Sequence, residues 1–312
     1  MPTISIVIPT RNGGTRFQKV LESLRHQTIS ANAEILVIDS KSTDDTPNIA
    51  TQWGANVISI DPTSFNHGYT RNVGIENTSG EFIILLTQDA LPANTHFIKS
   101  LLHAMQEFQA AGVHAKQIPL ADASPLAKHH VRTWVSGQGD RMIKQIKSPQ
   151  QLFPLPPSQQ HLYCVFENVA GMVRREVWEK IPFPETPFGE DLDWGFRVIC
   201  NGYTLVYEPN AVVEHSHERS PAYTYWRTFI DHYKLFDLFG LRTIPTKPKI
   251  LRSFLLSTMS DWGVLFRHPE FRIKWLKDMI HAPAHAWASS WGQYRGAKTS
   301  ANGTPIEKIQ GV

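Results

Sequence analysis

Short apolar runs alternate with amphipathic stretches through the first ninety residues of the chain. Between the first two runs, the apolar residues recur at i, i+3, i+4 and i+7, which predicts a helix with one buried face: Phe17, Val20, Leu21 and Leu24. Further helices are predicted after the turn Ser42–Pro47 and from Gly68 to Glu76. The apolar runs themselves have the length of buried strands, at Ile4–Ile8, Ile35–Ile38, Val57–Ile60 and Phe82–Leu86. This alternation predicts right-handed βαβ units in a parallel sheet.

The run Phe82–Leu86 contains five apolar residues in a row, without the alternation of a half-buried strand. A strand of this kind is predicted to be buried on both faces, as in a parallel sheet. It leads through Thr87 and Gln88 to Asp89, which places a carboxylate at the carboxyl end of the strand. Open α/β sheets bind ligands outside these ends, so Asp89 is a candidate to meet a metal ion or a phosphate. Alternatively, Asp89 caps a following helix that has Pro92 in its first turn.

The pattern weakens after a helix predicted between Ala93 and Phe108. Several prolines interrupt the segment from Gln117 to Leu162, which is therefore either a substrate loop or a plain insertion; the loop is the favoured interpretation. A strand is predicted again at Asn168–Val173, with a short helix near Val177–Trp178. The second half of the chain thus returns to regular structure after a long interruption.

Three carboxylates open the helix predicted within Phe188–Arg197, and these are Glu190, Asp191 and Asp193. Acidic residues in a first turn are favoured by the helix dipole, so at least one of them has a purely structural explanation. Three in four positions exceed what capping needs. The cluster is therefore a candidate for chemistry.

The chain changes character after two predicted strands, Thr204–Tyr207 and Val212–Val213. Three amphipathic segments with interleaved Arg and Lys follow, at Tyr223–Phe239, Phe254–Phe266 and Trp275–Trp291. Their aromatic and basic residues suit a membrane interface, but packing on the main domain or on a second subunit explains the same stripes. We expect two parts, an α/β domain at 1–220 and a helical region at 221–312 that contacts a membrane surface or a second subunit.

The 312 residues suffice for a sizeable core, and a formal net charge of +3 is too small to argue for nucleic acid. Cys164 and Cys200 fit no metal spacing, and so few cysteines suit a reducing compartment. Neither a signal sequence nor a stretch of membrane-spanning length is recognised, so a cytoplasmic protein is expected. The dinucleotide fingerprint and the P-loop are also missing from the sequence, so a nucleotide would be held differently.

Several motifs together resemble, in the family's order, the inverting glycosyltransferases of family 2, which have the GT-A fold. The resemblance covers about residues 3 to 217 and rests on Ser5–Asn12, Val37–Thr46, Thr70–Asn72 and Thr87–Asp89. It implies an α/β protein with a Rossmann-like, mostly parallel sheet flanked by helices. The remaining residues would form a C-terminal helical extension.

The resemblance implies a donor site for a nucleotide sugar. Asp39 matches the carboxylate that accepts a hydrogen bond from the pyrimidine N–H, while Thr10 and Asn12 would line the base and ribose. Arg71 would approach the diphosphate as a permanent cation; a surface ion pair is the alternative. Asp39 could also be only a turn former. The implied donor-binding residues are Pro9, Thr10, Arg11, Asn12, Asp39, Arg71, Gln88 and Asp89.

The resemblance also implies a divalent metal, Mn²⁺ or Mg²⁺, on the donor diphosphate. Asp89 matches the second Asp of the family's Asp-x-Asp motif, whereas the first acidic position is Thr87 here. His215 lies where some family members complete the metal site, and His217 is a substitute for it. A His at a strand end can instead be purely structural. Mn²⁺ would tolerate an imidazole ligand better than Mg²⁺.

For the chemistry, Glu190–Asp191 matches the family's Glu-Asp motif, in which the Asp is the base. An inverting transfer needs a base that takes the proton of the acceptor hydroxyl, and close carboxylates raise one another's pKa toward neutrality. Asp191 is therefore the expected base, and Glu190 would orient the acceptor or the base. Asp193 and Trp194 are candidates to bind the acceptor, with a core position for Trp194 as the alternative.

Thr87–Ala90, combined with Phe65–Asn72, is similar to the subset of the family that transfers rhamnose from dTDP-L-rhamnose. The expected function is transfer of L-rhamnose to a hydroxyl of a lipid-linked surface polysaccharide precursor at the inner membrane face. A UDP-hexose donor and a non-catalytic nucleotide-sugar-binding scaffold are the alternatives, and a homo-oligomer is left open. A nucleotidyltransferase is disfavoured, because Arg11–Arg16 is a poor version of its loop.

Overall fold

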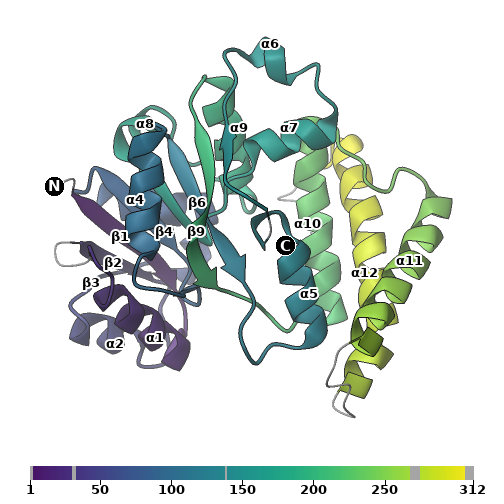
Figure 1. Ribbon diagram of the computed structural model, residues 1–312, viewed down its shortest axis with the longest axis horizontal. Coiled ribbons are helices and arrows are strands. Elements are labelled where there is room, and N and C mark those ends of the chain that lie inside the picture. Colours follow the sequence, from purple (N-terminus) through teal and green to yellow (C-terminus); the bar gives the residue numbers. More distant parts are fainter. Residues whose placement is uncertain (1–2, 30–32, 138, 268–274, 306–312) are drawn as a thin grey trace. The chain divides into compact units, whose positions relative to one another are not determined.

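A computed structural model describes residues 3–29, 33–137, 139–267 and 275–305. The chain forms two compact units (Figure 1). The first, called the sheet unit, comprises Met1–Ile118, Trp134–Leu155 and Leu162–His215. The second, called the helical unit, comprises Pro119–Thr133, Pro156–His161 and Ser216–Val312. Each unit is described by itself.

One nine-stranded sheet runs through the sheet unit in the order β3-β2-β1-β4-β8-β6-β9-β5, with β7 also paired to β9. Strands β1 to β4 are mutually parallel, and β6 and β9 run in the same direction as these four, because β8 is antiparallel to both β4 and β6. Six strands thus share one direction, as predicted for a mostly parallel sheet. The strands are β1 (Ile4–Thr10), β2 (Glu34–Asp39), β3 (Asn56–Ser59), β4 (Phe82–Leu86), β5 (Leu91–Pro92), β6 (Gly112–Ile118), β7 (Met142–Lys144), β8 (Ala170–Arg174) and β9 (Leu205–Glu214).

Helices cover both faces of the parallel part of the sheet. On one face, Ile6 and Ile8 of β1 share a core cluster with α1 and α4. On the other face, Gly74 of α3 leaves room for Val7, since a Cβ at Gly74 would lie 2.3 Å from Val7 Cγ1. The helices of this unit are α1 (Gly14–Arg25), α2 (Thr46–Gln52), α3 (His67–Glu76), α4 (Phe97–Glu107), α6 (Pro149–Leu152), α8 (Arg175–Lys180) and α9 (Glu190–Cys200).

The helical periodicity and the central strand predicted from the sequence are confirmed. The four apolar residues of the first predicted helix are all buried in α1. All five residues of β4 are buried as well. Because β1 and β2 are paired in parallel with Thr10 opposite Asp39, their carboxyl ends lie level with one another. This register positions the site described below.

The structure corrects three sequence predictions. After β4 the chain enters β5, and α4 begins only at Phe97, so Asp89 does not cap a helix that contains Pro92. The two strands predicted at Thr204–Tyr207 and Val212–Val213 are one strand, β9, because its pairing with β6 continues across an irregularity. The segment 117–162 is not simply a loop, since it holds β7, α6, a short 3-10 helix and two further helices, α5 (Pro125–Thr133) and α7 (Pro157–Cys164).

The helical unit contains α5 and three long helices, α10 (Pro221–Phe239), α11 (Lys247–Arg267) and α12 (Leu276–Ala301). Helices α10 and α12 pack closely because α12 presents glycines to the α10 backbone. A Cβ at Gly292 would lie 2.7 Å from the carbonyl oxygen of Tyr225, and one at Gly296 would lie 2.1 Å from that of Phe229. Among the described residues, no helix combines the length and the apolar character needed to cross a bilayer.

Candidate active site

The carboxyl ends of β1 and β2 bring Thr10 and Asp39 together. Both side chains are buried, and Thr10 Oγ1 donates to Asp39 Oδ1 at 3.3 Å. The other carboxylate oxygen, Oδ2, accepts from the backbone N–H of Ser42 at 2.9 Å. These contacts fix the Asp39 carboxylate at the edge of the sheet where an α/β fold binds its ligand.

The loop after β1 is held against the loops after β2 and β4. Asn12 adopts a left-handed backbone, with φ 51°, and its Oδ1 accepts from the backbone N–H of Thr43 at 2.8 Å. The Gln88 side chain makes two bonds to Arg11, accepting from its N–H at 2.9 Å and donating to its carbonyl at 3.2 Å. The structure therefore gathers the predicted donor-binding residues of three strand ends, with half-buried Pro9 inside β1.

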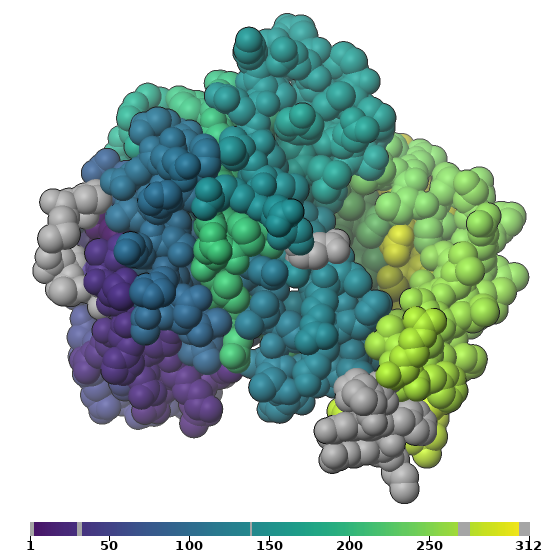
Figure 2. All heavy atoms as spheres, in the orientation of Figure 1, coloured from purple at the N-terminus to yellow at the C-terminus, as the bar shows by residue number. Residues whose placement is uncertain are grey.

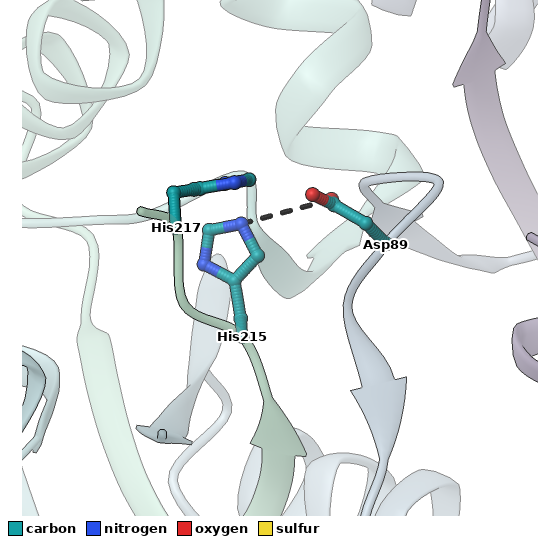
Figure 3. Close-up of side chains that lie close together, drawn as sticks. All are labelled: Asp89, His215 and His217. Carbon is teal, nitrogen blue, oxygen red and sulfur yellow. Dashed lines mark ion pairs between the residues drawn. The ribbon is translucent and has the colours of Figure 1, made fainter. Parts of the chain in front are cut away.

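Asp89 and His215 face one another across the ends of β4 and β9, as Figure 3 shows. His215 Nε2 lies 3.6 Å from Asp89 Oδ1. Arg16 holds the two loops together by donating to the carbonyl of Asp89 at 3.2 Å and to that of Glu214 at 3.0 Å. His217, the predicted substitute ligand, follows two residues after His215 in the chain.

The donor set of Asp89 and His215 fits a divalent cation. Two neighbouring ligands of an octahedral ion with bonds of about 2.1 Å lie about 3 Å apart, so a small closure of the 3.6 Å pair brings both onto one ion. A carboxylate oxygen and an imidazole nitrogen suit Mn²⁺ well. With few protein ligands, the ion would be completed by phosphate oxygens and waters.

Two further residues, Gln117 and Glu167, orient His215. Gln117 Nε2 donates to Glu167 Oε2 at 2.5 Å, so the amide oxygen of Gln117 faces the imidazole, at 2.9 Å from Nδ1. Nδ1 therefore donates to Gln117, and Nε2 is the ring nitrogen that faces Asp89. Neither residue was predicted. Gln117 lies on β6, whose polar His114, Lys116 and Gln117 hide the pattern of a strand, and Glu167 precedes β8 outside any motif.

Glu190, at the start of α9, belongs to a buried polar cluster. Arg71 Nη1 lies 3.1 Å from Glu190 Oε1, and Asn168 Nδ2 donates to the same oxygen at 3.0 Å. Burial opposes ionisation of Glu190, but the charges of Arg71 and His67 and the bond from Asn168 outweigh it and lower the pKa of this carboxyl. Glu190 is therefore a fixed anion beside Asp191.

Asp191 keeps part of its surface open, and its carboxylate accepts from the N–H of Leu192 at 2.8 Å and of Asn168 at 3.3 Å. Its surroundings raise its pKa to about 7, first through burial and then through the negative charges of Glu190 and Glu167. A carboxylate with this pKa takes up a proton readily near neutrality, as a general base requires.

Arg71 is more enclosed than the sequence predicted. Its side chain is only 5 % exposed, so the surface ion pair considered as an alternative is wrong and the pair with Glu190 is an interior one. Arg71 Nη1 also donates to the carbonyl of His67 at 3.1 Å. In this structure the guanidinium thus faces Glu190, next to the candidate base.

The two candidate acceptor-binding residues have different surroundings. Asp193 accepts from Arg197 Nε at 2.8 Å, one turn along α9. Trp194 is fully buried, donates to the carbonyl of Ile181 at 2.7 Å and packs against Phe183. The acceptor contact predicted for Trp194 is therefore not available here, because a ring without exposed surface has a core role. Asp193 and Trp194 are adjacent in the chain at the acidic start of α9, so sequence spacing did not separate their roles.

The mostly parallel sheet and the polar residues gathered at the carboxyl ends of its strands are those of a glycosyltransferase of the GT-A type. The family model described as "Glycosyl transferase family 2" matches residues 5–166, and the chain belongs to this family. It is 35% identical to the O-antigen chain rhamnosyltransferase WbaN of Salmonella anatum over 73% of this chain and 71% of that protein. It is also 35% identical to the O-antigen chain rhamnosyltransferase RfbN of Salmonella typhimurium, over 72% and 70%.

A solved structure shares the fold. The mannosyltransferase PcManGT from Pyrobaculum calidifontis, in complex with GDP-Man and Mn²⁺, superposes with a TM-score of 0.54. The match covers 97% of this chain and 76% of that chain at 16% identity. An identity this low supports the fold alone.

Proposed function

We propose that the protein transfers L-rhamnose from dTDP-L-rhamnose to a hydroxyl of a lipid-linked saccharide, with inversion and with Asp191 as the general base. The observation that carries the proposal is the placement of Asp191, a partly open carboxylate on the family's Glu-Asp motif, directly beside Glu190, which is buried and paired with Arg71. The two relatives that are rhamnosyltransferases of an O-antigen chain support the sugar and the class of acceptor.

The residues of the three strand ends would bind the donor. Asp39 would accept from the N–H of the thymine ring, since its carboxylate is already fixed by Thr10 and Ser42. Asn12 and Arg11, on the exposed loop, would line the base and ribose together with Pro9 and Gln88. Arg71 would attract the diphosphate by its positive charge, part of which is neutralised by the ion pair with Glu190.

Asp89 and His215 would hold a divalent cation, with His217 as the substitute for His215. Such a cation supplies positive charge that stabilises the leaving diphosphate. Gln117 would keep the lone pair of His215 Nε2 directed at the ion through its bond to Nδ1. Arg16 would keep the two ligand-bearing loops together.

In the transfer, the Asp191 carboxylate takes the proton of the acceptor hydroxyl as its oxygen bonds to the anomeric carbon. The bond between this carbon and the diphosphate oxygen breaks at the same time, and dTDP leaves with the electron pair. Glu190, held as an anion by Arg71, keeps Asp191 basic. Asp193, on the same turn of α9, is our candidate to contact the acceptor.

We also propose that residues 1–220 carry donor binding and catalysis, and that residues 221–312 bring the enzyme to the inner face of the membrane, with a homo-oligomer as the alternative. The free thiols Cys164 and Cys200 support a reducing, cytoplasmic setting. Burial raises the pKa of Cys164 to about 12, which keeps this thiol protonated and inert.

The test measures binding and hydrolysis of dTDP-L-rhamnose, UDP-glucose and UDP-galactose, each with Mn²⁺, Mg²⁺ or a chelator. We expect metal-assisted binding of dTDP-L-rhamnose and slow hydrolysis that Asp191→Asn abolishes while binding survives. Exposed Asp140 provides the matched control. Asp140→Asn should leave both the binding and the slow hydrolysis of dTDP-L-rhamnose unchanged. Preference for a UDP-sugar would overturn the assignment of dTDP-L-rhamnose as the donor. A protein that binds none of the three donors would support the non-catalytic scaffold alternative.

A further inference from the structure

Helix α11 carries an exposed apolar stripe. Apolar residues recur along it at intervals of three or four positions, which places them on one side of a helix with 3.6 residues per turn. Their side chains stay open to solvent, and Leu255, Met259 and Phe266 are 49%, 66% and 62% exposed. Figure 2 shows α11 at the surface of the helical unit. The stripe consists of Leu251, Leu255, Met259, Trp262 and Phe266.

The neighbouring helix α12 extends this apolar surface. Trp262 of the stripe donates to the carbonyl of Met279 at 3.0 Å, next to Ile280, which is 67% exposed. Further along α12, the exposed ring of Trp287 makes an edge-to-face contact with Phe254 of α11, with 5.7 Å between the ring centroids. Two packed helices of one unit thus both leave large apolar side chains uncovered.

The exposed charges of α11 itself have one sign. The exposed ionisable residues of α11 are all basic: Lys247, Lys249, Arg252 and Arg267. At about 100° per residue, Lys247 and Arg252 project on opposite sides of the apolar stripe. The carboxylate of α11, Asp261, is buried and lies 3.3 Å from His130 Nε2. An apolar stripe bordered by cations matches an amphipathic helix that lies in the interface of a membrane.

A second copy of the chain fits this surface less well. A self-complementary contact would bring the four cations of one stripe toward the same four cations of its partner, and like charges repel. Anionic lipid head groups supply the opposite charge, and the acyl boundary receives the apolar side chains. Aromatic rings such as Trp262 and Trp287 favour the same boundary.

We propose that the exposed face of α11 binds the surface of an anionic lipid bilayer, with its apolar side chains inserted and its four cations on the head groups. The inference deepens the membrane part of the proposed function and rests on that part, and it involves no donor or metal. Lipid binding and donor binding are therefore measured separately, so that one can fail without the other.

The experiment sediments the full-length protein with vesicles of phosphatidylcholine, with or without about one third phosphatidylglycerol. We expect binding to the anionic vesicles that weakens as salt is raised. Replacing Arg252 and Lys247 with Gln should weaken the partitioning about fivefold for each cation removed. Met259→Ser combined with Phe266→Ser should weaken it about tenfold or more, since two exposed apolar side chains no longer insert.

Exposed residues outside this face provide the matched controls. Phe153 of the sheet unit is 58% exposed, and Phe153→Ser should leave vesicle binding unchanged. Thermal unfolding and binding of dTDP-L-rhamnose should be the same in all variants, which shows that each chain is folded. Wild-type protein that stays in the supernatant, or stripe variants that bind as well as wild type, would overturn the inference. A dimer in analytical ultracentrifugation that Met259→Ser and Phe266→Ser dissociate would overturn it in favour of a second copy.

Discussion

Arg71 and Glu190 form a buried ion pair, with 3.1 Å between Nη1 and Oε1, and Glu190 directly precedes Asp191 in the chain. The pair keeps Glu190 ionised in the interior, and this charge in turn raises the pKa of Asp191. Removing the cation should therefore affect both the stability of the sheet unit and the basicity of the candidate base.

Replacing Arg71 with Met leaves Glu190 as an unpaired buried charge. We expect the free energy of unfolding to fall by about 3–5 kcal/mol, as measured by urea denaturation. Adding Glu190→Gln should restore part of the loss, because the double variant buries no unpaired charge. If the single and double variants were equally unstable, packing of the Arg71 side chain rather than its charge would be the cause.

The rate of transfer should depend on the ionisation of Asp191. Because the base acts in its deprotonated form and its pKa is about 7, kcat/KM should fall as the pH drops below about 7. Glu190→Gln removes the neighbouring negative charge and leaves the Arg71 charge unbalanced, and both changes lower the pKa of Asp191. The acidic limb of the pH profile should therefore move to lower pH.

A matched control for this profile is Glu179, which is exposed on α8. Glu179→Gln should leave the acidic limb in place, because this carboxylate is not among the groups that raise the pKa of Asp191. An acidic limb that stayed in place in Glu190→Gln as well would show that another group limits the rate at low pH.

Gln117 should matter for metal affinity although it does not touch the ion. Gln117→Leu removes the acceptor of the His215 Nδ1 proton, and loss of such a partner weakens metal binding by about 10- to 100-fold. Mn²⁺ binding followed by electron paramagnetic resonance in the absence of donor measures this directly. Exposed Gln106→Leu is the control and should bind Mn²⁺ like wild type. Equal affinity in all three proteins would mean that the bond from His215 to Gln117 does not support metal binding.

The sequence predicted those parts of the fold in which hydrophobic pattern decides structure. Strand β4 and helix α1 bury their apolar residues as their spacing predicts. Strand β6 escaped prediction because its His114 and Gln117 are polar residues buried by tertiary contacts. Such contacts join residues far apart in the chain, and periodicity carries no information about them.

The residues of the candidate site also fall into a group that the sequence predicted and a group whose surroundings it did not. Motif order identified Asp39, Asp89 and Asp191 at strand and helix ends. The enclosure of Arg71 depends on its partner Glu190, which lies more than a hundred residues away in the chain. The core position of Trp194 depends on Phe183 and on the carbonyl of Ile181. Spacing along the chain predicts neither.

The close packing of α10 against α12 gives a prediction for the helical unit. A methyl group at Gly296 would lie 2.1 Å from the carbonyl oxygen of Phe229, so Gly296→Ala must push the two helices apart. We expect the free energy of unfolding to fall by about 1–3 kcal/mol, as for other overpacked interiors. Thermal or urea unfolding of the full chain measures the change.

Gly263 provides the opposite case within the same unit. A Cβ at Gly263 of α11 meets nothing within 4 Å, so Gly263→Ala adds no clash and removes conformational freedom from the unfolded chain. It should stabilise the protein by up to about 1 kcal/mol. Substitutions of one kind, in helices of one unit, should therefore change stability with opposite signs. If Gly296→Ala were also neutral or stabilising, the close approach of α10 and α12 would not be needed for the fold, and the glycines of α12 would need another explanation.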